Sequence, residues 1–179
     1  QFSQSYFMFW DKLEKSNYFL ESVIQTANED WSSRIVMHLL ANPIQDGGQW
    51  DMWVNLINKY GVLPQAAMPE SFSSSRSMRM NQMITRKLRE NAQTLRNDKN
   101  KGASNSDLQD LKTGMLKEIY RMLSIHLGEP PNSFDWQVRD KKKNFIKYEN
   151  MTPKSFYSQH VGLDLENYVC LINCPMSDK

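Results

Sequence analysis

The stretch DGGQWDMWVNLINKYGVLPQAAMPES, residues 46–71, joins two adjacent glycines to an amphipathic helix and then to a proline-punctuated segment. Its apolar residues recur at helical spacing and predict a helix over residues 49–60, on the evidence of Trp50, Trp53, Val54, Ile57 and Tyr60. Gly61 follows where a helix C-terminus commonly needs a left-handed residue. The stretch therefore predicts a helix that is preceded by bare backbone.

The glycine pair allows two interpretations. Without Cβ atoms, Gly47 and Gly48 can adopt positive φ and let another chain come close. Such a segment can pair its own N–H and C=O groups with an extended peptide. The alternative is a tight turn that binds no ligand.

Apolar periodicity predicts mostly helices on both sides of this stretch. We expect helices over residues 3–27 and 34–40, and a polar linker that also offers N-caps over residues 70–77. A long helix is expected over residues 77–100. The next should start at Ser106, with Gln109 completing a capping box, and should end before Gly128. The short connection predicts that these two helices form an antiparallel hairpin.

The last part of the chain shows alternating apolar residues, which indicate strands. Phe134, Trp136 and Val138 predict one strand of a β-hairpin, and a return strand is expected near residues 145–148, after a polar turn at 140–144. Thr152 and Pro153 read as an N-cap with proline at the first helical position, opening a short helix to about His160. A buried strand is predicted over residues 168–172.

Composition bounds the class of protein. The 179 residues are 40% apolar and carry a formal net charge of +2, so the chain can bury a core and shows no global attraction to nucleic acid or membrane. No apolar run has transmembrane length. The two cysteines do not make a disulfide framework in a chain of this size, which is typical of a reducing compartment.

Several long motifs resemble one branch of the papain-like cysteine peptidases, the bleomycin hydrolase and aminopeptidase C family. They are DGGQWDM with KYGV and MPES, FSQSYFMFWDKLEK upstream, and LGEPPNSFDWQVRDKKKNF and TPKSFYSQHVG downstream. The resemblance covers nearly the whole chain. It implies an α+β, predominantly helical fold that forms the middle part of a papain-like peptidase, with a helical-hairpin insertion and a small β-hairpin.

The resemblance also implies a division of the chain. Residues 1–72 would belong to the helical domain of the papain-like fold, and residues 73–131 would be the insertion. Residues 132–179 would lead back toward the catalytic half. In this family the nucleophilic cysteine precedes the segment resembling FSQSY, and the catalytic histidine and asparagine follow the segment resembling VCLINCP. We therefore expect an internal fragment without a catalytic triad residue, inactive by itself.

The resemblance implies a substrate-binding role for Asp46, Gly47, Gly48, Gln49 and Trp50. Gly48 would hold the substrate residue next to the scissile one through its backbone N–H and C=O. Gln49 and Trp50 would shape the wall of that pocket. The resemblance further implies a peptide substrate, a cytoplasmic location, a homohexamer in the full-length parent, and neither a metal nor another cofactor.

Other candidate sites are weaker. Cys170 and Cys174 are expected to be small packed thiols, because no further ligands complete a metal site. A catalytic pair in which either cysteine is the nucleophile and His160 the base is rejected. His38 and His126 are expected to be packed or capping residues.

A second hypothesis concerns the basic helix, where residues 76–101 hold eight Arg or Lys and two acidic residues. On this hypothesis the chain is a non-catalytic helical binding module with a face for nucleic acid or another partner. A solvated helical face or a subunit contact is the favoured interpretation, since few aromatic residues are interleaved to stack on bases.

Overall fold

Three long helices dominate the computed structural model, which describes residues 1–169 and 171. In chain order the elements are α1 (Gln4–Gln25), α2 (Arg34–Ala41), α3 (Trp50–Tyr60), α4 (Phe72–Ser75), α5 (Met78–Asn100), α6 (Asn105–Leu127), β1 (Phe134–Arg139), β2 (Phe145–Met151), α7 (Pro153–Phe156), the π-helix η1 (Tyr157–Val161) and the 3-10 helix η2 (Leu165–Asn167). The expected fold class, predominantly helical with a small antiparallel hairpin, is confirmed.

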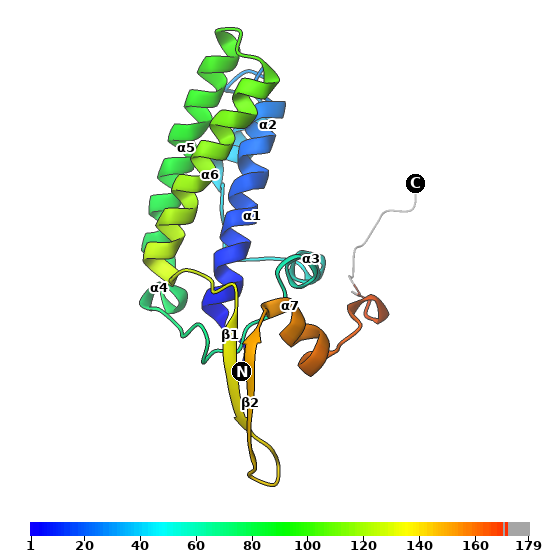
Figure 1. Ribbon diagram of the computed structural model, residues 1–179. Coiled ribbons are helices and arrows are strands. Elements are labelled where there is room, and N and C mark those ends of the chain that lie inside the picture. Colours follow the sequence, from blue (N-terminus) through cyan, green and yellow to red (C-terminus); the bar gives the residue numbers. More distant parts are fainter. Residues whose placement is uncertain (170, 172–179) are drawn as a thin grey trace.

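Helices α1, α5 and α6 lie side by side in Figure 1 and enclose the larger core. Each presents apolar residues at helical spacing to the other two, so burial of one stripe depends on both partners. The fully buried side chains of this core include Phe9, Phe19, Leu20, Ile84, Leu88, Leu95, Leu108 and Ile119. The first helix and the predicted insertion 73–131 thus share one core, and the proposed domain division stays a prediction.

The predicted helical hairpin is confirmed, but its second helix is capped two residues earlier than expected. Ser104 is the N-cap of α6, and its side chain accepts a hydrogen bond from the backbone N–H of Asp107. The Asp107 carboxylate accepts in return from the backbone N–H of Ser104. The prediction of Ser106 with Gln109 was wrong because both serines satisfy the motif spacing, and the carboxylate at Asp107 favours the earlier one.

The end of the opening stretch anchors the start of α1. Glu70 accepts hydrogen bonds from the backbone N–H groups of Gln4 and Ser5, at 2.7 and 3.1 Å. Ser3 donates its hydroxyl to the Met68 carbonyl at 2.6 Å. The predicted polar linker that follows is wrong in part, because α4 forms within it. The expectation of N-caps there is confirmed by the capping box of Ser71 with Ser74.

A smaller core joins α3 to the β-hairpin and α7. The predicted hairpin is confirmed, and its register pairs Trp136 with Tyr148 and Val138 with Ile146. Its inward face packs with α3 and α7 around a second set of buried side chains, Ile57, Val62, Met151, Phe156 and Leu165. Thr152 caps α7 and Pro153 occupies its first turn, as predicted.

Gly61 ends α3 and packs against the start of α7 in this smaller core. Its φ of 77° and ψ of −160° lie in a region that is essentially restricted to glycine. A Cβ on Gly61 would lie 2.4 Å from the carbonyl carbon of Pro153. The predicted glycine at the helix terminus is confirmed, and close packing is a second reason for it.

The predicted buried strand over residues 168–172 is wrong for the residues described. Tyr168, Val169 and Leu171 are outside any strand, and Val169 is 82% exposed. Cys170 and Ile172 lie outside the described residues, as does Cys174. An apolar run by itself does not distinguish a buried strand from an exposed segment, because burial requires a partner surface.

Candidate functional site

The glycine pair lies on the segment between α2 and α3, which runs beside α1 (Figure 1). The buried side chains of Pro43 and Ile44 anchor its start. Residues 45–49 are exposed, and α3 begins immediately afterwards. The segment is therefore tied down at both ends and open to solvent in the middle.

The fold itself does not require glycine at positions 47 and 48. Neither residue has its φ in the left-handed region, so the positive φ considered from the sequence is not adopted. A Cβ added to Gly47 or Gly48 would meet no atom within 4 Å. Neither backbone conformation nor internal packing explains the pair, and close approach by an outside group remains as a physical reason for bare backbone.

Gly48 also has free hydrogen-bonding groups. Within residues 1–169 and 171, neither its N–H nor its C=O makes a hydrogen bond. It lies between two shallow hollows of about 410 and 360 Å³, and Gln49 and Met52 line both of them as well. We call Gly48, Gln49 and Met52, which separate the two hollows, the Gly48 ridge. An extended peptide that crossed the Gly48 ridge would meet one unpaired donor and one unpaired acceptor, both on Gly48.

Two lysines of α1 hold the backbone just before Gly48. Lys15 donates to the carbonyl oxygens of Gln45 and Gly47 at 2.8 and 2.7 Å. Lys12 donates to the same Gln45 carbonyl at 2.8 Å and forms an ion pair with Asp46 at 2.7 Å. The ammonium groups thus satisfy carbonyls that the loop itself leaves without partners.

Asp46 connects this segment to a second helix. Its carboxylate accepts hydrogen bonds from the Ser77 hydroxyl and the Asn81 amide, at 2.8 and 2.9 Å. Burial alone would raise the pKa of Asp46, but the hydrogen bonds from Lys12, Asn81 and Ser77 outweigh it and lower the pKa to about 2. Burial lowers the pKa of Lys12, and the Asp46 carboxylate opposes that change. Asp46 is thus engaged by the protein itself and remains charged at neutral pH.

The other two predicted site residues differ in position. Gln49 lines both hollows with an exposed side chain. Trp50 lines neither of them and packs against Trp53 and Tyr168, with ring centroids 5.1 and 6.1 Å away. Trp50 therefore supports the start of α3, while Gln49 faces the open space beside Gly48.

Sequence reasoning did not identify the two lysines, although one of them left a signal. Lys12 is 0% exposed and lies on the buried stripe of α1, at helical spacing between Phe9 and Phe19. A lysine on an apolar stripe requires a polar partner, because an unpaired buried charge is very costly. The pattern predicts that a partner exists, but not which residue supplies it.

Most of the basic helix is occupied by contacts within the protein. Arg96 is buried, donates to the carbonyls of Thr26 and Glu29, and stacks on Trp31. Arg89 donates to the carbonyls that end α2, and Lys87 pairs with acidic residues of α5 and α6. These contacts favour a structural role for the helix over a nucleic-acid face.

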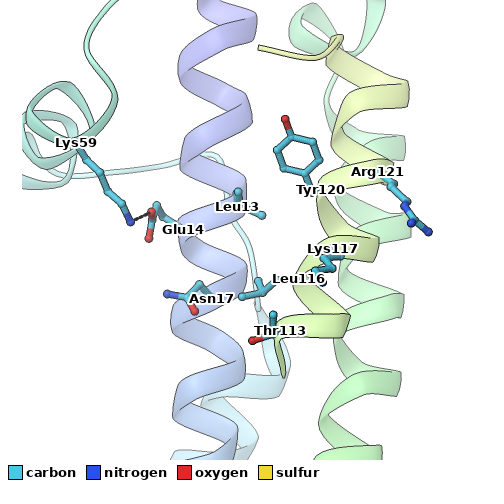
Figure 2. Close-up of a pocket in the computed structure, with 9 residues that line it drawn as sticks. All are labelled: Leu13, Glu14, Asn17, Lys59, Thr113, Leu116, Lys117, Tyr120 and Arg121. Carbon is cyan, nitrogen blue, oxygen red and sulfur yellow. Dashed lines mark hydrogen bonds and ion pairs between the residues drawn. The ribbon is translucent and has the colours of Figure 1, made fainter. Parts of the chain in front are cut away.

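A larger hollow of about 590 Å³ lies between α1 and α6 (Figure 2). Leu13, Leu116 and Tyr120 supply apolar surface there, while Glu14 and Lys59 pair with each other at its edge. Among residues 1–169 and 171, its lining contains neither histidine nor glycine. Its described lining offers no bare glycine backbone for an extended peptide to pair with, so the Gly48 ridge is the better candidate site.

The histidines lie apart from one another. His126 shares a hydrogen bond with Ser73, which confirms a packed role. His38 is exposed in the last turn of α2, so packing was wrong for it, while the capping alternative stays a prediction. His160 packs among Trp136, Tyr148 and Phe156. Over the described part of the chain, no group of three or more His, Cys, Asp or Glu could hold a metal ion, and no helix has the length and apolarity to cross a membrane.

Comparison with known proteins adds a family to this geometry. The model of the Peptidase C1-like family matches residues 1–179. Aminopeptidase C of Listeria monocytogenes is 50% identical over 179 residues, which are 100% of this chain and 40% of that protein. Human bleomycin hydrolase is 43% identical, over 98% of this chain and 39% of its own length.

A solved structure agrees. PepW from Lactobacillus rhamnosis HN001 superposes with a TM-score of 0.96 at 47% identity, covering 100% of this chain and 40% of that one. The chain thus spans about 40% of the length of the relatives that it matches.

Proposed function

Because the chain belongs to the Peptidase C1-like family, we propose that it is the substrate-positioning part of a cysteine aminopeptidase of the bleomycin hydrolase type. The complete protein would hydrolyse peptide amides. Its nucleophilic thiolate would come from sequence outside these 179 residues, and the chain alone would be inactive.

One observation carries this proposal: the backbone of Gly48 is exposed and unpaired among the described residues, on a ridge between two hollows. An extended peptide would accept a hydrogen bond from its N–H and donate one to its C=O. Gln49 would border the bound residue. The two backbone contacts would hold the peptide without reading its side chain, which suits an enzyme that accepts many sequences.

The chemistry would follow from this positioning. The thiolate would attack the carbonyl carbon of the scissile amide. The amide nitrogen would take a proton from the catalytic histidine, also outside this chain, and leave as the amine while the acyl-enzyme forms. Water would then hydrolyse the thioester and regenerate the thiol. The contribution of this chain is to place that carbonyl before the nucleophile, which lowers the entropic part of the barrier.

Two further properties belong to the proposal. The complete protein would act in the cytoplasm and assemble as a homohexamer. The helical bundle exposes several large apolar side chains by more than half, including Met78, Met83 and Ile125. Their exposure supports the proposal that other subunits cover this surface in the assembly.

Substituting Gly48→Ala in the complete protein tests the site. Because a Cβ at this position meets nothing within 4 Å and φ is not left-handed, folding should be unaffected. A methyl group at position 48 should keep the substrate backbone from coming within hydrogen-bond distance of residue 48. The value of kcat/KM should then fall by roughly tenfold to a hundredfold. Gly114→Ala on α6 is the matched control, since its Cβ also meets open space. Unchanged kcat/KM in Gly48→Ala would refute the assigned site.

A second measurement tests the activity itself. The complete protein and the 179-residue chain are compared on a fluorogenic aminoacyl amide. We expect cleavage by the complete protein only. Cleavage by the chain alone would contradict an external nucleophile, and cleavage by neither would contradict the aminopeptidase assignment.

A further inference from the structure

Lys15 uses all three hydrogens of its ammonium group, one within α1 and two on the segment before Gly48. It donates to the Asp11 carboxylate at 2.7 Å, to the Gln45 carbonyl at 2.8 Å and to the Gly47 carbonyl at 2.7 Å. Its side chain is 12% exposed, while the two backbone carbonyls that it reaches belong to exposed residues. An ammonium with three acceptors in fixed positions holds each of them in one orientation.

The bond to the Gly47 carbonyl sets the direction of the next N–H. A peptide unit is planar, and none in the described chain is cis. In a trans unit the C=O and the following N–H point to opposite sides. When Lys15 draws the Gly47 carbonyl toward α1, the Gly48 N–H must therefore point away from α1, toward the open side of the ridge.

From this geometry we infer that Lys15 is a positioning residue, which aims the Gly48 N–H at the backbone of a bound peptide. The inference rests on the proposed function for its ligand, but its structural part concerns only the Gly47–Gly48 peptide unit. Glycine has the widest backbone freedom of any residue, so two adjacent glycines do not hold one orientation by themselves. The Lys15 ammonium, from α1, fixes the orientation that the glycines themselves do not fix.

Lys12 and Asp46 reinforce the same orientation. The Gln45 carbonyl accepts from both lysines at 2.8 Å, which uses both of its lone pairs. Asp46 pairs with Lys12 and accepts hydrogen bonds from residues of the α5 region. The backbone directly before the glycines is therefore held from two helices at once.

The test substitutes Lys15→Met in the complete protein, which keeps the aliphatic stem and removes the three donors. Crystal structures should show the Gly47–Gly48 peptide unit turned or without a single orientation. The value of kcat/KM should fall about tenfold, mainly through KM, since a misdirected Gly48 N–H costs the bound peptide one hydrogen bond. Lys15→Arg, which keeps donors, should restore most of the loss. Lys59→Met removes a lysine of α3 that lines neither hollow beside Gly48, and should change neither quantity.

The outcomes separate the two proposals. A Gly47 carbonyl that keeps its orientation in Lys15→Met would overturn the inference, whatever the activity. An equal loss in Lys15→Arg would also overturn it, because a general structural role would then suffice. A wild-type protein that cleaves no amide would refute the proposed function, while the crystal structures would still decide the role of Lys15. If Lys15→Met does not fold, Lys15→Gln, whose shorter side chain does not reach the carbonyls, is measured with the same expectations.

Discussion

Replacing Gly61 with alanine should destabilise the protein more than any other glycine substitution in the described chain. Two independent costs act at this position. The first is conformational, because φ 77° with ψ −160° is a region that side chains strongly disfavour, at a cost of about 1–3 kcal/mol. The second is steric, because the new Cβ would lie 2.4 Å from the Pro153 carbonyl carbon and 2.5 Å from the Lys154 nitrogen.

The steric cost is large because backbone atoms make the contact. Pro153 must retreat by roughly 1 Å before the carbon–carbon distance becomes ordinary. Its retreat would stretch the hydrogen bond from the Val62 N–H to the Pro153 carbonyl, now 3.2 Å, and would withdraw Phe156 from the smaller core. Together with the conformational term, we expect a loss of at least about 4 kcal/mol.

Gly128 provides a matched control for this substitution. It has φ 88° and ψ 159°, a similar glycine-only conformation, but its added Cβ would meet only the Met68 terminal methyl group at 3.9 Å. Gly128→Ala should therefore cost only the conformational term, about 1–3 kcal/mol. Urea denaturation followed by circular dichroism measures both variants. Equal losses within about 0.5 kcal/mol would refute the argument from close packing, given the accuracy of such measurements.

Two further predictions concern the cap of α6 and the acid limb of stability. Ser104→Ala should cost about 1 kcal/mol in urea denaturation and Ser106→Ala less than about 0.5 kcal/mol, because only Ser104 caps the helix; the reverse order would restore the prediction made from the sequence. The folded-state pKa of Asp46, about 2, lies below the value of about 3.9 in an unfolded chain, so its ion pair with Lys12 adds stability that is complete above about pH 5 and is lost as pH falls toward 2. The difference in stability between wild type and Asp46→Asn should accordingly shrink between pH 5 and 2, and a constant difference would contradict the lowered pKa.

Local patterns were sufficient to predict most secondary structure. The stripes of α1, α5 and α6, the glycine after Tyr60 and the Thr152–Pro153 start of α7 each have a signal within a few residues. The failures share one physical cause. The cap at Ser104 depended on a choice between two near-equivalent serines, and the burial of Tyr168, Val169 and Leu171 depended on a partner surface. Groups outside the local pattern decide both outcomes.

The candidate site divides in the same way. The place of the glycine pair before α3 followed from the sequence, and the resemblance to a peptidase family directed attention to Gly48. The structure showed that the pair is exposed. The sequence did not show that the Asp46 carboxylate is already engaged by Lys12, nor that Trp50 turns toward Trp53 and Tyr168. The first fact depends on how the α2–α3 segment lies against α1 and α5, and the second on where the segment of Tyr168 lies beside α3.

Composition and periodicity alone determined that this chain is a helical protein with a bare glycine segment, because side-chain spacing and missing Cβ atoms act within a single element. The tertiary structure decided which way that segment faces. Lys15 and the Gln45 carbonyl are 30 residues apart in the chain, and their hydrogen bond forms only after the helical core has docked the loop beside α1. Hydrogen bonds between a side chain and a distant backbone leave no periodic trace, since their partners are matched by position in space and not by spacing along the chain.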